Sequence, residues 1–377
     1  MKIACFAYNR NERRFFEKIT PHLDATLEII YVNRERRMSP KAYKVLQQSD
    51  LHEEINFKTA FWQASGQKKS SKITSFIYRY YAKVMANYLF MKYYTTLSQK
   101  PYDGLMLWSG VTFRQSIAKK AALSLGLKTL FIENGLLPNT IVLDAKGVNF
   151  TNSLPREPFF YQNYIPPSTP LPQNLIPRLP KNEEKFSKQN TKLPAKYIFI
   201  PFQVDYDTQL IVNSPWIKDM RALFQLFESI QNDIKDQQLH FIFKEHPSSL
   251  IDYPDLHEKA SKNRHLHIIN DHSTQELIEK AQAVVTINST VGIESLLLGK
   301  KVIVLGNAFY NIEGITKTAM NKSELTTVIN DLDHWQPDPL LREKFLKYLY
   351  FEYLVPGTFE EEDVNQYNKI NQILKKL

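Results

Sequence analysis

Long hydrophobic runs are missing from this sequence. None of its 377 residues belongs to a run that approaches the roughly 18 to 20 apolar residues of a membrane-spanning helix. Residues 1–8 are apolar, but the polar residues 9–14 follow at once, so this segment is too short for a secretory signal peptide and predicts a buried strand. Its Cys5 is the only cysteine, which excludes an internal disulfide and a cysteine-rich metal site. We therefore expect a cytoplasmic protein.

Several motifs of well-known chemistry are also missing. The sequence has no Walker phosphate loop, no Gly-x-Gly-x-x-Gly dinucleotide motif and no His-Glu-x-x-His metal motif. Neither zinc-finger spacing nor an aromatic RNA-binding signature occurs, so nucleic acid is not an expected partner. The close acid pair Asp205 and Asp207 lies beside Gln203 and Thr208, a pattern that differs from the metal-dependent Asp-x-Asp type. We expect no bound metal.

Positive charge and aromatic side chains are what the sequence has instead. The net charge is +9, which suits an anionic substrate or an anionic lipid surface, while a basic surface without any electrostatic task is the plain alternative. Residues 76–81 and 88–94 interleave tyrosines with lysine or arginine. Helices of this composition suit a membrane interface, and a helix buried against a sheet fits the same pattern. We expect peripheral contact with the inner membrane.

Short apolar runs alternate with helix-length segments along both halves of the chain. Runs such as 104–108 and 128–132 predict buried strands, and residues 38–99 predict mostly helix. Residues 155–194 contain nine of the twenty prolines, which break helices and strands and so predict a connector. The expected parts are a first Rossmann-like domain at 1–155, a proline-rich linker at 156–195, a second Rossmann-like domain at 196–340, and C-terminal helices at 341–377.

This alternation is typical of parallel sheets joined by helical crossovers. We therefore expect an α/β protein with two Rossmann-like domains facing a cleft. Ligands of open α/β sheets bind outside the carboxyl ends of the strands, so four segments that follow predicted strands are the candidate sites. A fold class alone does not give a function, and the residues of these segments must supply it.

Two of these segments carry carboxylates. Glu133 comes directly after a predicted strand, where it can act as a general base on an acceptor hydroxyl; a loop-capping glutamate is the equal alternative. Asp205 and Asp207 are two residues apart and share one face if the chain is extended. One of them could be a nucleophile or an electrostatic partner of an oxocarbenium-like centre. Asp207 is equally well suited to cap a helix that begins at Thr208.

The third segment ends a strand on four residues, Lys244, Glu245, His246 and Pro247. It brings a cation, an acid and an imidazole to one rim of the predicted sheet, and the proline restricts the chain direction just after the histidine. A lone histidine is usually structural, but this position favours contact with a phosphate or a donor substrate. We expect Lys244, His246 and Pro247 to contribute to such a site.

The fourth segment leads from a strand into a helix through Asn288, Ser289 and Thr290, with Gly292 in the first turn. Free backbone N–H groups at a helix start, together with two hydroxyls, form an anion site for a nucleotide phosphate. Glu294, about one turn into the helix, can reach a ribose hydroxyl pair. Ser289 as an ordinary helix N-cap uses the same atoms, so both interpretations can hold.

Together the four segments resemble the capsule-biosynthesis family of CMP-Kdo-dependent, retaining β-Kdo transferases. The resemblance implies a GT-B-type glycosyltransferase and spans residues 105–315, with four motifs in the right order. Asn134 departs from the family, in which many members have Asp. The matching residues are Glu133-Asn134-Gly135 with Pro138, Gly147-Val148-Asn149, Gln203-Val204 with Asp207, His246-Pro247, and Asn288-Ser289-Thr290 through Glu294 to Gly299.

The resemblance implies a role for each candidate residue. Asp207 is then the nucleophile that displaces CMP and forms a covalent glycosyl intermediate, and Glu133 is the base that activates the acceptor hydroxyl. His246 contacts the donor phosphate. The donor is CMP-β-Kdo and no separate cofactor is needed; the acceptor is a glycan or glycolipid, and the proteins of capsule or O-antigen assembly are the expected partners. The residues implied to hold the nucleotide are Ser289, Thr290 and Glu294.

Three other functions fit parts of the same pattern. Bacterial sialyl- and polysialyltransferases carry similar motifs and also use CMP-activated ulosonic acids; an inverting enzyme of that kind would use Glu133 as its sole base. A polyol-phosphate transferase would use the histidine and the helix start but would move a phosphoryl group. A non-enzymatic partner of capsule assembly would use none of these residues for chemistry.

Overall fold

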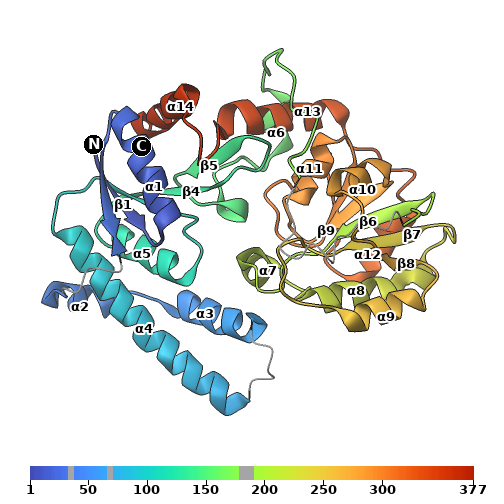
Figure 1. Ribbon diagram of the computed structural model, residues 1–377, viewed down its shortest axis with the longest axis horizontal. Coiled ribbons are helices and arrows are strands. Elements are labelled where there is room, and N and C mark those ends of the chain that lie inside the picture. Colours follow the sequence, from blue (N-terminus) through green and yellow to red (C-terminus); the bar gives the residue numbers. More distant parts are fainter. Residues whose placement is uncertain (33–37, 66–70, 178–190) are drawn as a thin grey trace. The chain divides into compact units, whose positions relative to one another are not determined.

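The computed structural model describes residues 1–32, 38–65, 71–177 and 191–377. The chain divides into two compact units, of which the first comprises Met1–Ser153 with Tyr353–Leu377 and the second comprises Leu154–Glu352. Each unit is built on a six-stranded sheet with helices packed on it (Figure 1). The expected α/β class with two Rossmann-like domains is confirmed.

The sheet of the first unit has the order β12-β5-β4-β3-β1-β2. Strands β1 to β4 are parallel, whereas β5 runs antiparallel to β4 and β12 antiparallel to β5. The antiparallel edge was not expected, because the sequence pattern indicated parallel strands only. The strands are β1 Lys2–Ala7, β2 Thr26–Tyr31, β3 Gly104–Trp108, β4 Lys128–Asn134, β5 Thr140–Asp144 and β12 Val355–Pro356.

Helices pack on both faces of this sheet. Because alternate strand residues point to opposite faces, Cys5 packs in one core with α1 and α14, while the neighbouring Phe6 contacts Tyr93 of α4 on the other face. Gly126 follows α5 in the left-handed conformation that glycine adopts easily, with φ 72°. The helices are α1 Arg10–Ile19, α2 Pro40–Leu46, α3 His52–Ser65, α4 Lys72–Ser98, α5 Phe113–Leu123 and α14 Val364–Lys375.

The sheet of the second unit has the order β11-β10-β9-β6-β7-β8, and all of its strands are parallel. Read from β8, this is the 3-2-1-4-5-6 order of the dinucleotide-binding Rossmann fold, in which the strand order reverses between β6 and β9. The strands are β6 Tyr197–Pro201, β7 His240–Lys244, β8 Leu266–Ile268, β9 Ala283–Thr286, β10 Lys301–Val304 and β11 Lys317–Thr318.

Two cores sandwich this second sheet. Ile198 and Ile200 pack with α8, α9 and α12, while Tyr197 and Phe199 pack with α10 and α11 on the opposite face. Full burial of one such aliphatic or aromatic side chain contributes about 1.5–3 kcal/mol. The helices are α6 Pro158–Gln162, α7 Thr208–Asn213, α8 Met220–Ile230, α9 Pro254–Ser261, α10 Thr274–Lys280, α11 Val291–Leu297, α12 Lys322–Asn330 and α13 Pro339–Lys347, followed by a π-helix at Tyr348–Tyr353.

The unit boundaries differ from the expected ones at two places. The described part of the proline-rich stretch lies in the second unit, where Tyr161 of α6 meets Phe345 of α13 edge to face at 5.2 Å. The C-terminal residues 341–377 divide between the units, because α13 packs on α6 whereas α14 packs on the first sheet. Helical periodicity shows which face of a terminal helix is apolar, but it does not show which sheet that face meets.

Candidate functional site in the second unit

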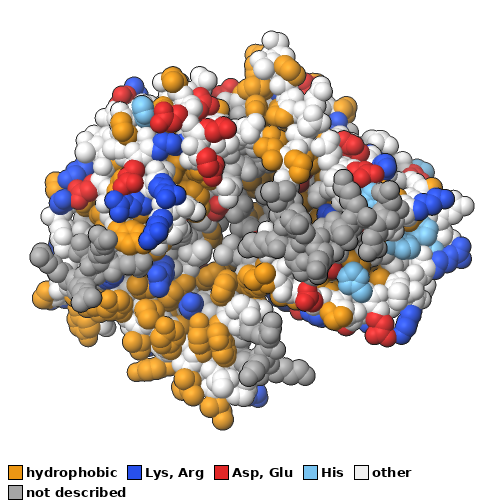
Figure 2. Space-filling model, in the orientation of Figure 1, with side chains coloured by type: hydrophobic (Ala, Val, Ile, Leu, Met, Phe, Trp, Pro, Cys, Tyr) orange, Lys and Arg blue, Asp and Glu red, His pale blue; other side chains and the backbone are white. Residues whose placement is uncertain are grey.

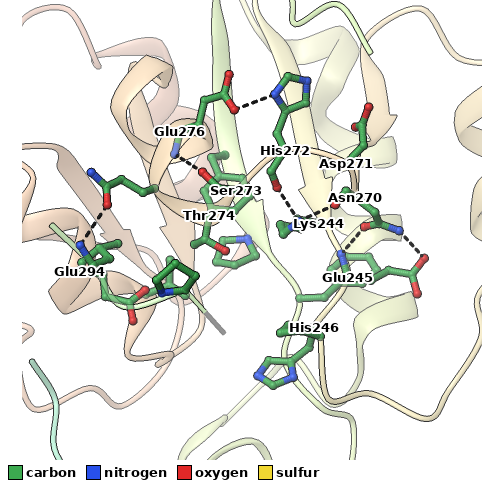
Figure 3. A pocket seen from close by; sticks show the side chains of 18 of the residues that line it. Lys244, Glu245, His246, Asn270, Asp271, His272, Ser273, Thr274, Glu276 and Glu294 are labelled. Carbon is green, nitrogen blue, oxygen red and sulfur yellow. Dashed lines mark hydrogen bonds and ion pairs between the residues drawn. The ribbon is translucent and has the colours of Figure 1, made fainter. Parts of the chain in front are cut away.

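A pocket of about 440 Å³ opens at the carboxyl ends of the strands of the second unit. Four of the expected site residues line it, namely Lys244, His246, Pro247 and Glu294. The other lining residues come from residues 175–177, from the ends of β6 and β7, from the loop after β8, and from α10 and the first turn of α11. Figure 3 shows this pocket from close by.

Lys244 lies at the end of β7 and is buried. Its Nζ donates to the carbonyl oxygens of Asn270 and His272, each at 2.7 Å (Figure 3). Burial lowers the pKa of Lys244 to about 8. These contacts join the exit of β7 to the loop after β8, so Lys244 shapes a wall of the pocket and contributes positive charge from behind it.

Glu245 belongs to the same wall. The carboxylate is buried, and its Oε1 lies 2.7 Å from Nε2 of His257 and accepts from Nδ2 of Asn270 at 3.1 Å. The backbone N–H of Glu245 donates to Oδ1 of Asn270 at 2.9 Å. The sequence suggested that this acid reaches the same rim as the lysine and the histidine, and Glu245 does line the pocket with them, although its carboxylate belongs to a buried network.

His246 is oriented differently from its two neighbours. The backbone N–H of Ser248 donates to Nδ1 of His246 at 3.1 Å, so Nδ1 is an acceptor and the neutral ring carries its proton on Nε2. The ring is half-buried and lies apart from the network around Lys244 and Asn270 (Figure 3). An imidazole held in this tautomer can donate a hydrogen bond from Nε2 to an anionic oxygen.

Asn288 follows β9 and is buried between two loops. Its Oδ1 accepts from Nε2 of Gln203 at 3.0 Å, and its Nδ2 donates to the carbonyl of Gln209 at 3.0 Å. These bonds span the point where the strand order reverses, between β6 and β9. Asn288 therefore ties the two loops together, and its side chain is used within the protein.

Ser289 and Thr290 precede α11, which begins at Val291. The hydroxyl of Ser289 accepts from the N–H of Val291 at 3.2 Å, but the N-cap position of α11 is Thr290 rather than the expected Ser289, and Thr290 makes no side-chain cap hydrogen bond. Tyr310 donates from its hydroxyl to the carbonyl of Ser289 at 2.6 Å. It also packs so closely on Gly292 that a Cβ there would lie 2.4 Å from the tyrosine hydroxyl oxygen. The start of α11 is thus held from two sides.

The two acids after β6 have separate environments. The N–H of Asp207 donates to the carbonyl of Val204 at 2.8 Å, which closes a turn, so Asp205 and Asp207 do not share a face as an extended chain would require. Asp205 is buried; its Oδ1 accepts from the N–H of Met220 at 2.8 Å and its Oδ2 from the hydroxyl of Tyr253 at 3.1 Å. Burial raises the pKa of Asp205, and these two donors oppose that shift.

Asp207 caps α7, as one of the two interpretations of the sequence expected. Its Oδ1 accepts from the N–H of Gln209 at 2.8 Å and lies 3.4 Å from the hydroxyl of Thr208. The residue is half-buried. Both of these contacts use Oδ1, so the capping of α7 does not involve Oδ2 of this carboxylate.

Glu133 lies in the first unit. It is the second-to-last residue of β4 and pairs with Val142 of β5. It is half-buried, and its Oε1 accepts from the N–H of Asn134 at 3.0 Å. The charge of Glu133 acts on Glu12, whose pKa is raised first by burial and further by Glu133, while Tyr8 and Asn9 lower it through hydrogen bonds. The first unit therefore has two interacting carboxylates at the carboxyl ends of its strands.

The loop after β8 is the part of the site that sequence reasoning missed. Asn270, Asp271, His272 and Ser273 line the pocket. His272 lies 2.7 Å from the carbonyl of Thr191 and 3.0 Å from Glu276. The sequence pattern did indicate this loop. A predicted strand ends at 269 and four polar residues follow it before a helix, as polar residues follow predicted strands in the four candidate segments. In the part of the chain that the structure describes, no group of three His, Cys, Asp or Glu side chains is placed to hold a metal ion.

Comparison with known proteins places this chain in a family. The model of the capsule polysaccharide biosynthesis proteins matches residues 179–359. The chain is 33% identical over 346 residues to protein FixF of Sinorhizobium fredii, and the match covers 88% of this chain and 82% of FixF. The chain belongs to the capsule polysaccharide biosynthesis protein family. The family expected from the four motifs is thereby confirmed.

Two further relatives add to this picture. The chain is 27% identical over 274 residues to the capsule polysaccharide export protein KpsS of Escherichia coli, covering 58% of this chain and 70% of KpsS. The solved structure of the β-Kdo 2,7 transferase of KpsC from Thermosulfurimonas dismutans aligns with a TM-score of 0.51 at 14% identity, covering 100% of both chains. That likeness shows a common fold, which is of the GT-B type.

Proposed function

We propose that this protein transfers β-Kdo from CMP-β-Kdo to a glycan or glycolipid acceptor with retention of configuration, in capsule or O-antigen assembly. Membership of the capsule polysaccharide biosynthesis family supports the biological setting. The fold in common with a β-Kdo transferase supports the reaction class. The proposal includes a cytoplasmic location with peripheral contact at the inner membrane, close to other proteins of the assembly.

The observation that carries the proposal is the pocket at the carboxyl ends of β6, β7 and β8, with His246 in its lining. Ser248 selects the tautomer that presents an N–H from Nε2, which suits a phosphate oxygen of CMP. Lys244 adds positive charge to the wall of the pocket. Pro247, the residue after the histidine, also lines it. Ligands of Rossmann-type sheets bind at this edge.

The start of α11 supplies the rest of the proposed nucleotide site. Glu294 lines the pocket and is assigned to the ribose hydroxyls. Ser289 and Thr290 are assigned to the nucleotide through the helix start, where N–H groups favour an anion. Asn288 is assigned an indirect part, because it holds the loop after β9 to the loop after β6.

In the first step, a carboxylate oxygen of Asp207 attacks the anomeric carbon of Kdo. The bond between that carbon and the phosphate oxygen breaks, and CMP leaves with the electron pair. The protein is then joined to the sugar through an ester. CMP is a good leaving group, so the step requires neither a strong general acid nor a metal. An Asp207 that uses only Oδ1 to cap α7 can react through its other oxygen.

In the second step, the acceptor hydroxyl attacks the same carbon and the ester to Asp207 breaks. Glu133 takes the proton of that hydroxyl as the general base. Two successive inversions leave the product in the configuration of the donor. The role of Glu133 rests on the family resemblance and on its place after a buried strand.

Release of CMP tests the reaction directly. The full chain is incubated with CMP-Kdo or with CMP-sialic acid and a glycolipid acceptor, and free CMP is measured. We expect release from CMP-Kdo only, and a β-linked product by NMR. Release from CMP-sialic acid would favour the sialyltransferase alternative, an α-linked Kdo product would contradict retention, and no release from either donor would contradict the enzyme assignment.

Calorimetry with CMP tests the phosphate assignment. We expect His246→Ala to weaken CMP binding about 10-fold to 100-fold, because a hydrogen bond to a charged group contributes roughly 1.5–3 kcal/mol. His334→Ala is the matched control, since His334 is exposed in the same unit and lies outside the pocket. Equal CMP affinity in both variants would remove His246 from the phosphate site.

A further inference from the structure

Helix α4 is apolar on more than one side. Its second half is part of the first core, where Leu89, Phe90 and Tyr93 are buried and Tyr93 lies 5.5 Å from Phe6. The sequence left the aromatic residues 88–94 with two interpretations, a membrane interface or a helix buried against a sheet. The structure buries most of them against the sheet and α5, so the second interpretation holds for this half of the helix.

The first half of α4 has one covered side and one open side. On the covered side, Ala82 and Ala86 are fully buried, and Tyr78 stacks on Trp62 of α3 with 4.4 Å between ring centres. The open side, here called the α4 apolar face, consists of side chains exposed by 39% to 73%. Its residues are Ile73, Phe76, Ile77, Tyr80, Tyr81, Val84 and Tyr88. They recur every three or four positions and so form one stripe on the helix.

Figure 2 shows hydrophobic side chains gathered where Figure 1 places α4. Exposed apolar patches of this kind, rimmed by polar residues, mark interaction surfaces in soluble proteins. Scattered exposed side chains occur elsewhere, such as Phe159 and Ile165 in the second unit. The α4 apolar face differs from them because seven such residues share one helix face.

The charged side chains of helix α4 itself all have one sign. Helix α4 contains no Asp or Glu, and its cations are Lys72, Arg79, Lys83 and Lys92. Arg79 and Lys83 also line a pocket of about 730 Å³ next to residues 46–55. Asp50, the carboxylate in the described lining of that pocket, lies 2.8 Å from Nδ1 of His52. The surface therefore combines apolar side chains with positive charge.

We propose that the α4 apolar face docks on an anionic lipid bilayer. The aromatic and aliphatic side chains enter the headgroup region, while Lys72, Arg79 and Lys83 meet lipid phosphates. A second copy of this chain would bring like charges together on the same face, so charge complementarity favours an anionic surface. No described helix is long and apolar enough to cross a membrane, and an interfacial helix needs no crossing. This inference rests on the membrane contact included in the proposed function and names the surface that makes it, but it is independent of the donor sugar.

Vesicle flotation with the full chain tests the proposal. The vesicles are phosphatidylcholine alone or phosphatidylcholine mixed with phosphatidylglycerol. We expect binding to the anionic vesicles only, and weaker binding as salt rises, because exposed charges are screened beyond about 8 Å at physiological ionic strength. Equal binding to neutral vesicles, or no binding to either, would overturn the proposal.

Two sets of variants identify the surface. We expect Phe76→Ser with Ile77→Ser to weaken binding by about 10-fold or more per side chain, since each loses the burial of a large apolar group. Phe159→Ser with Ile165→Ser is the matched control, because both residues are more exposed than 70% in the second unit. We expect Lys72→Gln and Lys83→Gln to weaken binding about fivefold each.

Thermal melting and CMP release with a soluble acceptor accompany these assays. Both should stay unchanged in the α4 variants, which separates loss of lipid binding from loss of fold or of transferase activity. If the α4 variants float as well as the controls, the face does not bind lipid. If they instead convert a dimer to a monomer in size-exclusion chromatography without a change in flotation, the face is a contact between copies and the proposal is wrong.

Discussion

The two units hold the loops at the carboxyl ends of their strands in different ways. Each sheet presents the carboxyl ends of its parallel strands at one edge, but the parallel part of the first sheet has the order β2-β1-β3-β4 and the second sheet has the order β8-β7-β6-β9-β10-β11. In the second unit, side chains bond the strand exits to one another: Gln203 to Asn288 and Asp205 to Tyr253. Such bonds fix the loops at the carboxyl ends of these strands relative to one another.

In the first unit, the strand exits are held locally. Ser109 and Gly110 after β3 both have positive φ, 54° and 75°, and Phe131 packs where a Cβ of Gly110 would lie. After β1, Asn9 and Glu12 cap α1 reciprocally. The second unit thus has a pocket beside loops that are bonded to one another, whereas the first unit has a carboxylate pair and the α4 surface, and the proposed function assigns the nucleotide to the second unit. The following predictions test this difference between the two units.

The largest effect is expected at the two acids after β6. Asp207→Asn should lower the rate of Kdo transfer about a thousandfold or more, because an amide cannot act as the nucleophile. It should leave the fold intact, since Asn caps a helix as well as Asp does. Initial rates of CMP release and thermal melting measure the two quantities.

Asp205→Asn is the matched variant and should behave in the opposite way. Its amide cannot accept from both Met220 and Tyr253, so we expect a loss of about 1–3 kcal/mol in the free energy of unfolding. Full activity in Asp207→Asn would contradict the mechanism. A larger rate loss in Asp205→Asn than in Asp207→Asn, at equal stability, would exchange their roles.

The next effect is expected at Glu133 of the first unit, which is proposed to act in the second step of the reaction. Glu133→Gln in the first unit should lower the rate of transfer about 100-fold to 10,000-fold, because a general base is lost, while CMP affinity stays unchanged. Mass spectrometry should detect protein heavier by one sugar, with the adduct on the peptide that carries Asp207. Glu17→Gln is the control, since Glu17 is an exposed partner of Arg13 in the same unit. A weaker affinity for CMP in Glu133→Gln would break the proposed division.

A stability effect compares two glycines, one in each unit. Gly292→Ala should lower the free energy of unfolding by about 1–3 kcal/mol, because the new Cβ would lie 2.4 Å from the hydroxyl of Tyr310. Gly126→Ala should cost about 1 kcal/mol, because its φ of 72° is unfavourable while no atom lies within 4 Å of the new Cβ.

Urea unfolding of both variants, and of Gly292→Ala with Tyr310→Phe, measures these costs. The second substitution removes the closest oxygen, so it should return part of the stability lost in Gly292→Ala. If Gly292→Ala is as stable as the natural protein, the start of α11 is not held by Tyr310 as described.

The smallest effect is a pH dependence at the loop after β8. Burial alone would lower the pKa of His272, but hydrogen bonding to Thr191 and Glu276 outweighs it and raises the pKa above the ordinary value of 6.5. The stabilisation is therefore fully present below about pH 6.5 and is lost as the pH rises through the higher pKa of the folded protein.

Thermal melting between pH 6 and pH 8 tests this dependence. The natural protein should lose slightly more stability over that range than His272→Gln, whose side chain does not titrate. Equal slopes in the two proteins would contradict the assigned pKa shift. Glu276→Gln should flatten the slope in the same way, because it removes the charge that favours the protonated ring.

Periodicity and turn residues alone determined most of the fold. The strand at Gly104–Trp108 and the start of α5 at Phe113 lie where the apolar runs predicted them, because burial and local propensity act on neighbouring residues. The capping of α7 by Asp207 could also be predicted from the sequence, since a cap uses atoms within three residues. The family, too, followed from short motifs in order along the sequence.

Tertiary structure alone decided which partners each candidate side chain has. Lys244, Glu245 and His246 are adjacent in sequence, yet Asn270 and His257 engage the first two from loops that come later in the chain, and only the histidine is left apart from that network. Likewise, one half of α4 is buried and the other exposed although their compositions are alike. The physical reason is the same in both cases: burial and hydrogen bonding depend on partners distant in sequence, and no local pattern records them.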